Sequence, residues 1–222
     1  METSFYGSRY CQELSESGIC CRGLHTEDDG KGSITILMDP LPNHTLYSME
    51  RSVAEAAVRS VAKLHAYFWG TAKSNSAVQE VGLAEQGTYW YLDTRPDEYD
   101  NLDGRSRSGI LARLKRAARG IDAALKERDY QAICHGDLKA CNMSLSLVPS
   151  LVTFVDFQYL GKACPGKDLA YLFVCGMDID DDFEEKQEDE LLRLYISELA
   201  ANGVGKDVDT PLPTLKILKQ AL

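Results

Sequence analysis

Two short segments contain the residue types that can hold a metal ion and a phosphate group beside a hydroxyl. Asp137 is followed five residues later by Asn142, and Asp156 comes at the end of an apolar run that starts at Leu151. A carboxylate can accept the proton of an attacking hydroxyl, while carboxylate and amide oxygens are the ligands that Mg²⁺ prefers. The pattern therefore predicts phosphoryl transfer, with Asp137 as the base and with Asn142 and Asp156 as the magnesium ligands.

Two neighbours of Asp137 belong to the same candidate catalytic set. Lys139 lies two residues further along, from where its ammonium can reach a γ-phosphate as a point charge. His135 opens the segment, and a role as a scaffold of the loop fits it better than direct participation. Each piece also has a purely structural interpretation, in which the segment is a turn, Asn142 caps it and Asp156 ends a strand. The combination, set between short β-like runs, favours the phosphotransferase site.

Composition limits the partners of the chain. Its 222 residues carry a formal net charge of -10, which argues against nucleic acid and against anionic membrane surfaces as partners. The sequence has no run of about 18 apolar residues and no signal peptide at its start, so we expect a cytoplasmic protein without a membrane partner. The seven cysteines are an odd number without a C-x-x-C pair, which favours reduced thiols over disulfides or a zinc site.

The pattern of apolar residues predicts an α+β fold. Two β-like runs within residues 19–38 form a hairpin, and two prolines at residues 40 and 42 mark a connector after it. We expect the helix at 107–127 to pack beneath the Asp137 segment, and we expect Asp168 to cap its own helix or to tie down a neighbouring loop. Residues 71–105 are weakly patterned and predict a long, loop-rich segment, which is either a lid or a substrate wall or simply a surface connection. The remaining expected elements are helices at 48–69, 168–175 and 184–202 and β-runs at 131–134, 143–148 and 151–155.

Three motifs resemble those of a known superfamily. Residues 135–142 (HGDLKACN), 155–158 (VDFQ) and 165–172 (PGKDLAYL) are similar to the catalytic loop, the metal-binding loop and the following helix of the aminoglycoside phosphotransferase and choline kinase-like superfamily. The ecdysteroid kinase-like group is the branch that the chain resembles most. Softer similarities at 63–69, 87–92 and 188–195 extend the resemblance over nearly the whole chain.

The resemblance implies a bilobal protein kinase-like fold that uses ATP and Mg²⁺ to phosphorylate a hydroxyl of a small molecule. Residues 1–41 would be a remnant of the small lobe and residues 42–222 the large lobe. The backbone of Met38, Asp39 and Leu41 would be the hinge that meets adenine. Glu2 would be the helix glutamate near the phosphates, and Asp168 would support the catalytic loop.

The chain departs from the family pattern at its front, where it has neither a G-x-G-x-x-G loop nor the lysine that contacts the phosphates. Two hypotheses follow. The chain is either a small-molecule kinase with a truncated gene model, or a shortened pseudoenzyme that acts as a binding or regulatory module. The intact set of Asp137, Asn142 and Asp156 favours the first, because a lobe without chemistry has no need of all three.

The identity of the acceptor stays open. Acidic residues between 178 and 190 are typical either of a cationic-substrate site or of a solvated surface. Tyr89, Trp90 and Tyr91 are suited either to line a pocket for a steroid-like or ammonium substrate or to pack in the core.

Overall fold

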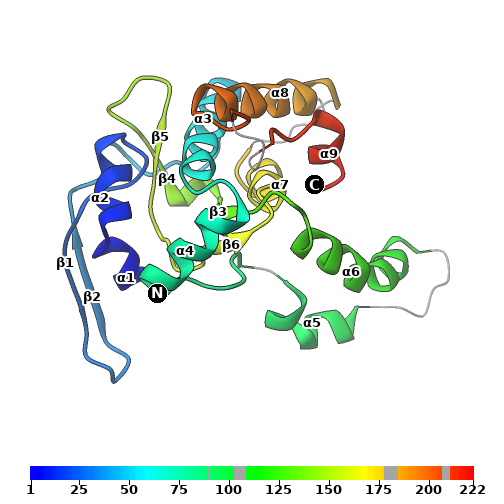
Figure 1. Cartoon of the computed structure of the whole chain (residues 1–222), viewed down its shortest axis with the longest axis horizontal. Coiled ribbons are helices and arrows are strands. Elements are labelled where there is room, and N and C mark those ends of the chain that lie inside the picture. The colour runs from blue at the N-terminus through cyan, green and yellow to red at the C-terminus, as the bar shows by residue number, and fades with distance from the viewer. Residues whose placement is uncertain (90, 103–108, 178–184, 207–210) are drawn as a thin grey trace.

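The computed structural model describes residues 1–89, 91–102, 109–177, 185–206 and 211–222 (Figure 1). Within these residues, the fold combines helices with three two-stranded antiparallel sheets, which pair β1 with β2, β3 with β6 and β4 with β5. The predicted α+β class is therefore confirmed. No helix in the described part of the chain is both long and apolar enough to span a membrane.

The N-terminal elements lie on one side of the molecule, at the left of Figure 1. They are α1 (Glu2–Tyr6), α2 (Arg9–Glu16), β1 (Gly23–Asp28) and β2 (Ile34–Met38). The predicted hairpin is confirmed, although its first strand begins later than residue 19 because residues 19 and 20 pair with β5 instead.

The N-terminal helices share one hydrophobic core with the rest of the chain. The Phe5 ring lies with its centroid 4.5 Å from that of Phe157, which follows the predicted metal ligand Asp156. This packing joins α1 directly to the metal loop. The proposed division into lobes between residues 41 and 42 stays a prediction.

Helix α3 (Arg51–Tyr67) is the centre of the fold, as its apolar spacing predicted. Its fully buried stripe includes Val58, Val61 and Leu64, and it packs against α8 (Glu185–Ala201), β3 and β5. Burial of such a stripe supplies most of the free energy that holds an amphipathic helix in place.

Four short strands hold the predicted site. They are β3 (Ala132–Cys134), β4 (Met143–Leu145), β5 (Val152–Phe154) and β6 (Gly161–Ala163), and the first three were predicted. The short 3₁₀ helix η2 (Ala140–Asn142) lies between β3 and β4. The register of β4 on β5 pairs Met143 with Phe154, so that Asn142 and Val155 lie side by side at the end of this pair.

The segment predicted as a long loop at 71–105 contains helices, so that prediction is wrong. It holds α4 (Thr71–Val81), η1 (Leu92–Thr94) and α5 (Pro96–Asn101). Ala77 and Val78 of α4 are buried in the core, although the small and polar residues around them obscure the helical pattern. Tertiary burial therefore supports a helix that the local sequence signals only weakly.

Helix α6 (Ile110–Lys126) forms where it was expected but does not lie beneath the Asp137 segment. It stands beside α5 at the edge of the molecule, away from the hairpin (Figure 1). Ala112 is its only buried residue, while 49% of Leu114 and 49% of Ile121 remain exposed. The prediction of its position is wrong because the apolar face of a helix does not specify which other element packs against that face.

The chain continues through α7 (Gly166–Cys175), confirmed as a helix, and ends with α9 (Leu215–Lys219). Helix α7 lies at the centre of the helical part in Figure 1 and is mostly apolar, with Leu169, Leu172 and Phe173 buried.

Candidate active site

The loop after β3 turns sharply at Gly136, which has a φ of +89°. A Cβ atom there would lie 2.6 Å from the carbonyl oxygen of Tyr159 and 2.7 Å from the Cα of Thr88. The backbone of residues 88 and 89 crosses the loop so closely that Tyr89 donates its amide to the Gly136 carbonyl at 2.8 Å. Only glycine satisfies both the left-handed backbone and this crossing.

Asp137 is buried, with 2% of its side chain exposed. Its Oδ2 atom accepts hydrogen bonds from Lys139 Nζ at 2.8 Å and from Asn142 Nδ2 at 3.1 Å. The hydrogen bond with Asp137 raises the pKa of Lys139. The structure thus brings together a buried carboxylate, a cation and an amide from a single loop.

The side chain of Asn142 is oriented by its hydrogen bonds. Its Nδ2 group donates to the backbone carbonyl of Asp137 at 2.9 Å as well as to the carboxylate, which points Oδ1 away from them. Its backbone carbonyl accepts from Val155 N at 3.0 Å, which fixes the catalytic loop against the residue that precedes Asp156.

Asp156 occupies the left-handed region with a φ of +66°. Its carboxylate accepts from Gln158 Nε2 at 3.2 Å. Aspartate tolerates this backbone better than most residues, and functional loops often keep such conformations. The side-chain oxygens of Asn142, Asp137 and Asp156 are hard donors of the kind that fits Mg²⁺.

His135 connects the two loops through both of its ring nitrogens. Nε2 donates to the carbonyl of Val155 at 3.0 Å, and Nδ1 accepts from the amide of Asp137 at 3.3 Å. The ring is buried, and burial lowers the pKa of His135 although nearby Asp168 opposes this. A neutral imidazole with both nitrogens occupied is suited to a scaffold.

Asp168 ties the catalytic loop to the core. Its carboxylate accepts from the amides of His135 at 2.8 Å and Gly136 at 2.9 Å and from His65 Nε2 at 3.0 Å. Burial alone would raise the pKa of Asp168. The hydrogen bond and charge of His65, the charge of His135 and the hydrogen bond from the Gly136 amide outweigh burial, so the pKa of Asp168 is lowered. Of the two roles expected for Asp168, the structure therefore shows the tie to a neighbouring loop, without a side-chain cap.

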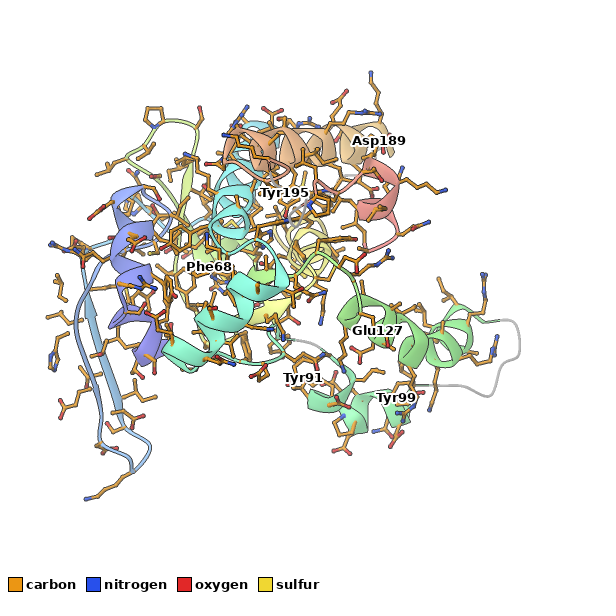
Figure 2. The ribbon with its side chains drawn as sticks, in the orientation of Figure 1. Phe68, Tyr91, Tyr99, Glu127, Asp189 and Tyr195 are labelled. Atoms are coloured by element: carbon orange, nitrogen blue, oxygen red, sulfur yellow. The ribbon has the colours of Figure 1, made fainter. Side chains whose placement is uncertain are left out.

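His65 is the core histidine that extends this network. Its Nδ1 lies 2.8 Å from the hydroxyl of Tyr195, a buried residue of α8 (Figure 2). His65, Cys134 and Asp168 also place metal-ligand atoms within 4.8 Å of one another. Because both nitrogens of His65 already have hydrogen-bond partners, the cluster is a structural network.

The residues predicted to meet ATP lie at two places. Glu2 contacts the metal loop, since its Oε1 accepts from Phe157 N at 2.9 Å, and burial followed by the charge of Asp156 raises the pKa of Glu2. Met38 ends β2, while Asp39 donates its amide to the Arg22 carbonyl at 2.9 Å and Leu41 is 37% exposed.

The segment after this predicted hinge is bound to β4. Asn43 donates its side-chain amide to the carbonyl of Leu145 at 2.7 Å and accepts from Ser144 Oγ at 2.9 Å. The predicted hinge is thereby held beside the strand that follows Asn142.

Tyr171 is a residue of this site that the sequence did not single out. Burial and then the charge of Asp137 raise the pKa of Tyr171, which places its hydroxyl near the carboxylate. Its position three residues after Asp168, on the same helix as a loop-binding residue, was the available signal.

The structure describes only some of the residues on which the two acceptor hypotheses depend. Tyr89 packs edge-to-face on Tyr159 with ring centroids 4.9 Å apart, whereas Trp90 lies outside the described residues. Residues 178–184 of the acidic run also lie outside them. On α8, Asp189 pairs with Lys219 at 2.8 Å and Glu190 pairs with Arg51 at 3.2 Å, so these carboxylates form surface ion pairs.

A buried aspartate and an asparagine whose backbone is bonded to the residue before a second aspartate, on a helix-rich body with a small β-hairpin at its side, match the arrangement expected of a kinase-like phosphotransferase. The chain belongs to the phosphotransferase enzyme family, whose family model matches residues 8–203. No curated protein gives a significant match.

Solved structures show the same fold. The aminoglycoside-3'-phosphotransferase of type VIII matches with a TM-score of 0.50 and 19% identity over 99% of this chain and 80% of its own. Choline kinase LicA from Streptococcus pneumoniae has a TM-score of 0.52 and 15% identity over 96% of this chain and 66% of its own. Amicoumacin kinase hAmiN, in complex with AMP-PNP and Ca²⁺, has a TM-score of 0.54 and 12% identity over 90% of this chain and 61% of its own.

The chain thus spans less than two thirds of the length of two of these three structures. At identities of 12 to 19% the likeness supports the fold alone. The predicted protein kinase-like fold of the aminoglycoside phosphotransferase type is confirmed, and the ecdysteroid kinase-like subgroup stays a prediction.

Proposed function

We propose that the protein is an ATP- and Mg²⁺-dependent phosphotransferase that moves the γ-phosphoryl group of ATP to a hydroxyl of a small molecule. One observation carries this proposal: the buried carboxylate of Asp137 lies within 3.1 Å of Asn142 Nδ2, and the backbone of Asn142 is joined at 3.0 Å to Val155, which precedes Asp156. These contacts support the assignment of a base and two oxygen ligands to neighbouring loops.

Three similar structures agree with this reading. Their names describe kinases or phosphotransferases of an aminoglycoside, of choline and of amicoumacin, and the last was solved with AMP-PNP and a divalent cation. The acceptors in these names are small molecules, which supports a small-molecule acceptor for this chain.

ATP would supply the phosphoryl group, and Mg²⁺ would neutralise the charge of its phosphates. Asp137 takes the proton of the acceptor hydroxyl as the oxygen forms its bond to the γ-phosphorus and the bond to the bridging oxygen breaks, so that ADP leaves with that electron pair. Asn142 and Asp156 would hold the cation through oxygen atoms. Lys139, paired with Asp137 at 2.8 Å, is placed to share its charge with the phosphoryl group that is transferred.

Replacement of Asp137 tests the role of the base. D137A should lower the turnover of alcohol-dependent ADP release by on the order of 10²- to 10⁴-fold while ATP affinity changes little. Asp97, an exposed aspartate of α5, offers the control D97A, which should keep wild-type turnover. Equal turnover of D137A and wild type would remove Asp137 from the mechanism.

Replacement of Asp156 tests the metal site separately. D156N removes one charge from the ligand set, so Mg²⁺-dependent binding of nucleotide, measured by calorimetry, should weaken by about tenfold or more. Unchanged affinity would contradict the assignment. A wild-type protein that binds nucleotide but releases no ADP with any alcohol would favour the alternative, a pseudokinase-like binding module.

A further inference from the structure

An apolar groove runs along the exposed face of α6. It has a volume of about 350 Å³, within the range of small-molecule sites. Its walls are mainly aliphatic and come from α6, from the end of α5 and from η1. The side chains that form these walls are Leu92, Leu102, Leu114, Ile121 and Leu125.

One end of the groove is formed by Tyr91 and Lys167. Tyr91 lies between the main body and the pair of helices α5 and α6 (Figure 2). The ammonium of Lys167, from the first turn of α7, is 5.6 Å from the centroid of the Tyr91 ring. The groove is thus apolar along its length and carries a cation at one end.

Lys167 has no close carboxylate partner in the described part of the chain. Asp122, the acidic residue of the groove, instead binds Lys126 at 2.6 Å. Burial lowers the pKa of Lys167, and the charges of Asp122 and Asp168 only partly offset this. A half-buried ammonium without a hydrogen bond would gain free energy from an anion placed beside it.

A second cavity of about 320 Å³ continues past Lys167 and adds Lys126 and Lys162 to its lining. Lys162 binds Asn75 Oδ1 at 2.7 Å and Glu85 at 3.7 Å. Lys126 lies 2.6 Å from Asp122 and 3.4 Å from Asp93. Lys126 and Lys162 are thus paired with carboxylates, and within the described residues Lys167 is the lysine of these two cavities that is left to pair with an anion.

The charged end of the groove lies beside the catalytic loop. Lys167 and Tyr171 are four residues apart on α7, so they share one face of the helix, about 6 Å apart along its axis. Burial and then the charge of Asp137 raise the pKa of Tyr171, and Tyr89, two residues before Tyr91, donates its amide to the carbonyl of Gly136 at 2.8 Å. A ligand in the groove can therefore extend a hydroxyl towards Asp137.

We propose that the acceptor is an amphipathic alcohol whose apolar body lies along α6 and whose carboxylate or other anionic group pairs with Lys167. This inference rests on the proposed phosphotransferase function. It differs from a cationic acceptor, such as the choline or aminoglycoside in the names of similar structures, because the groove presents an unpaired cation and aliphatic walls.

Equilibrium binding of three fluorescent naphthols, one with a carboxylate, one without charge and one with an ammonium group, tests the charge preference without ATP. The carboxylate probe should bind about tenfold more tightly than the uncharged probe, and the ammonium probe most weakly. K167M should remove this preference and leave the affinity of the uncharged probe nearly unchanged.

Lys73 provides a matched control, because its ammonium lies 4.8 Å from the centroid of the Tyr67 ring and burial also lowers its pKa. K73M on α4 should keep the preference. L114S, at a position already 49% exposed and therefore compatible with folding, should weaken all three probes to a similar degree, which assigns their binding to the groove.

Three results would overturn the inference: an ammonium probe that binds as tightly as the carboxylate probe, a carboxylate affinity that K167M leaves unchanged, or no binding of any probe at millimolar concentration. These outcomes are independent of nucleotide. Failure of the phosphotransferase proposal would instead appear in the turnover of D137A, so the two failures are distinguishable.

Discussion

Single side chains around the catalytic loop act mainly through what they hold in place. Asp168 binds two consecutive amides of the loop, and His65 binds Asp168 in turn. His135 fastens the same loop to the strand that leads to Asp156. The orientation of Asp137 thus depends on buried groups that need not touch a substrate, which is how an active-site residue is kept in one geometry.

His135 makes stability depend on pH. Burial lowers its pKa below the value of about 6.5 for an unfolded histidine. The neutral ring therefore contributes stability that is fully present above about pH 6.5 and is lost as pH falls towards the folded pKa, because the unfolded chain binds the extra proton. Urea melts between pH 5 and 8 should show this decline at up to about 1.4 kcal/mol per pH unit.

The comparison that isolates this effect uses two variants. H135N should have a shallower decline than wild type, since the proton uptake of residue 135 is removed. H25Q, at an exposed position of β1, should keep the wild-type slope. Parallel pH curves for wild type and H135N would show that His135 does not carry this linkage.

Among the elements, α3 and β5 are joined by the side chain of Ser60, which bonds to the edge of β5 where a neighbouring strand could otherwise pair. Ser60 Oγ donates to the carbonyl of Val152 and accepts from its amide, both at 2.8 Å. Both partners are buried. The hydroxyl therefore satisfies the backbone groups at the open edge of β5, four residues before Asp156.

Removal of this hydroxyl should be costly. S60A leaves the amide and the carbonyl of Val152 buried without partners, so the free energy of unfolding should fall by about 2 to 4 kcal/mol. S52A, near the exposed start of the same helix, should change it by less than about 0.5 kcal/mol. Denaturant melts of the two variants measure the difference, and an equal effect would contradict the assigned role of Ser60.

At the scale of the whole molecule, the described structure has a tightly packed body and a thinly attached edge. The body joins α3, α8, the four central strands and the N-terminal helices in one core. Helix α6 touches this body mainly through Leu125 and buries only Ala112 fully. In the groove proposed for the acceptor, Lys167 comes from the buried helix α7, whereas the side chains of α6 come from a helix with few contacts to the core.

Hydrogen exchange should reveal this difference. Amides of α6 should open with free energies about 3 kcal/mol or more below those of α3, because few apolar contacts resist local unfolding of α6. Mass spectrometry of peptides from both helices measures the contrast, with α8 as a second reference from the body. Equal protection of α6 and α3 would show that α6 is part of the central cooperative unit.

The sequence by itself predicted the catalytic and metal-binding residues and determined much of the helical framework. The spacing of Asp137, Asn142 and Asp156 predicted one site because short loops between short strands keep such residues close. The stripe of α3 predicted its burial, since 3.6-residue periodicity is a local property. Weak local patterns hid α4 and β6, which owe their stability to contacts from distant segments.

Only the tertiary structure decided what each surface meets. It placed α6 at the edge instead of beneath the catalytic loop, joined His65 to Asp168 across 103 residues, and brought Tyr171 to Asp137. It also left the ammonium of Lys167 in an apolar groove. Such outcomes depend on desolvation and packing between segments far apart in the chain, and no local pattern of residues specifies those partners.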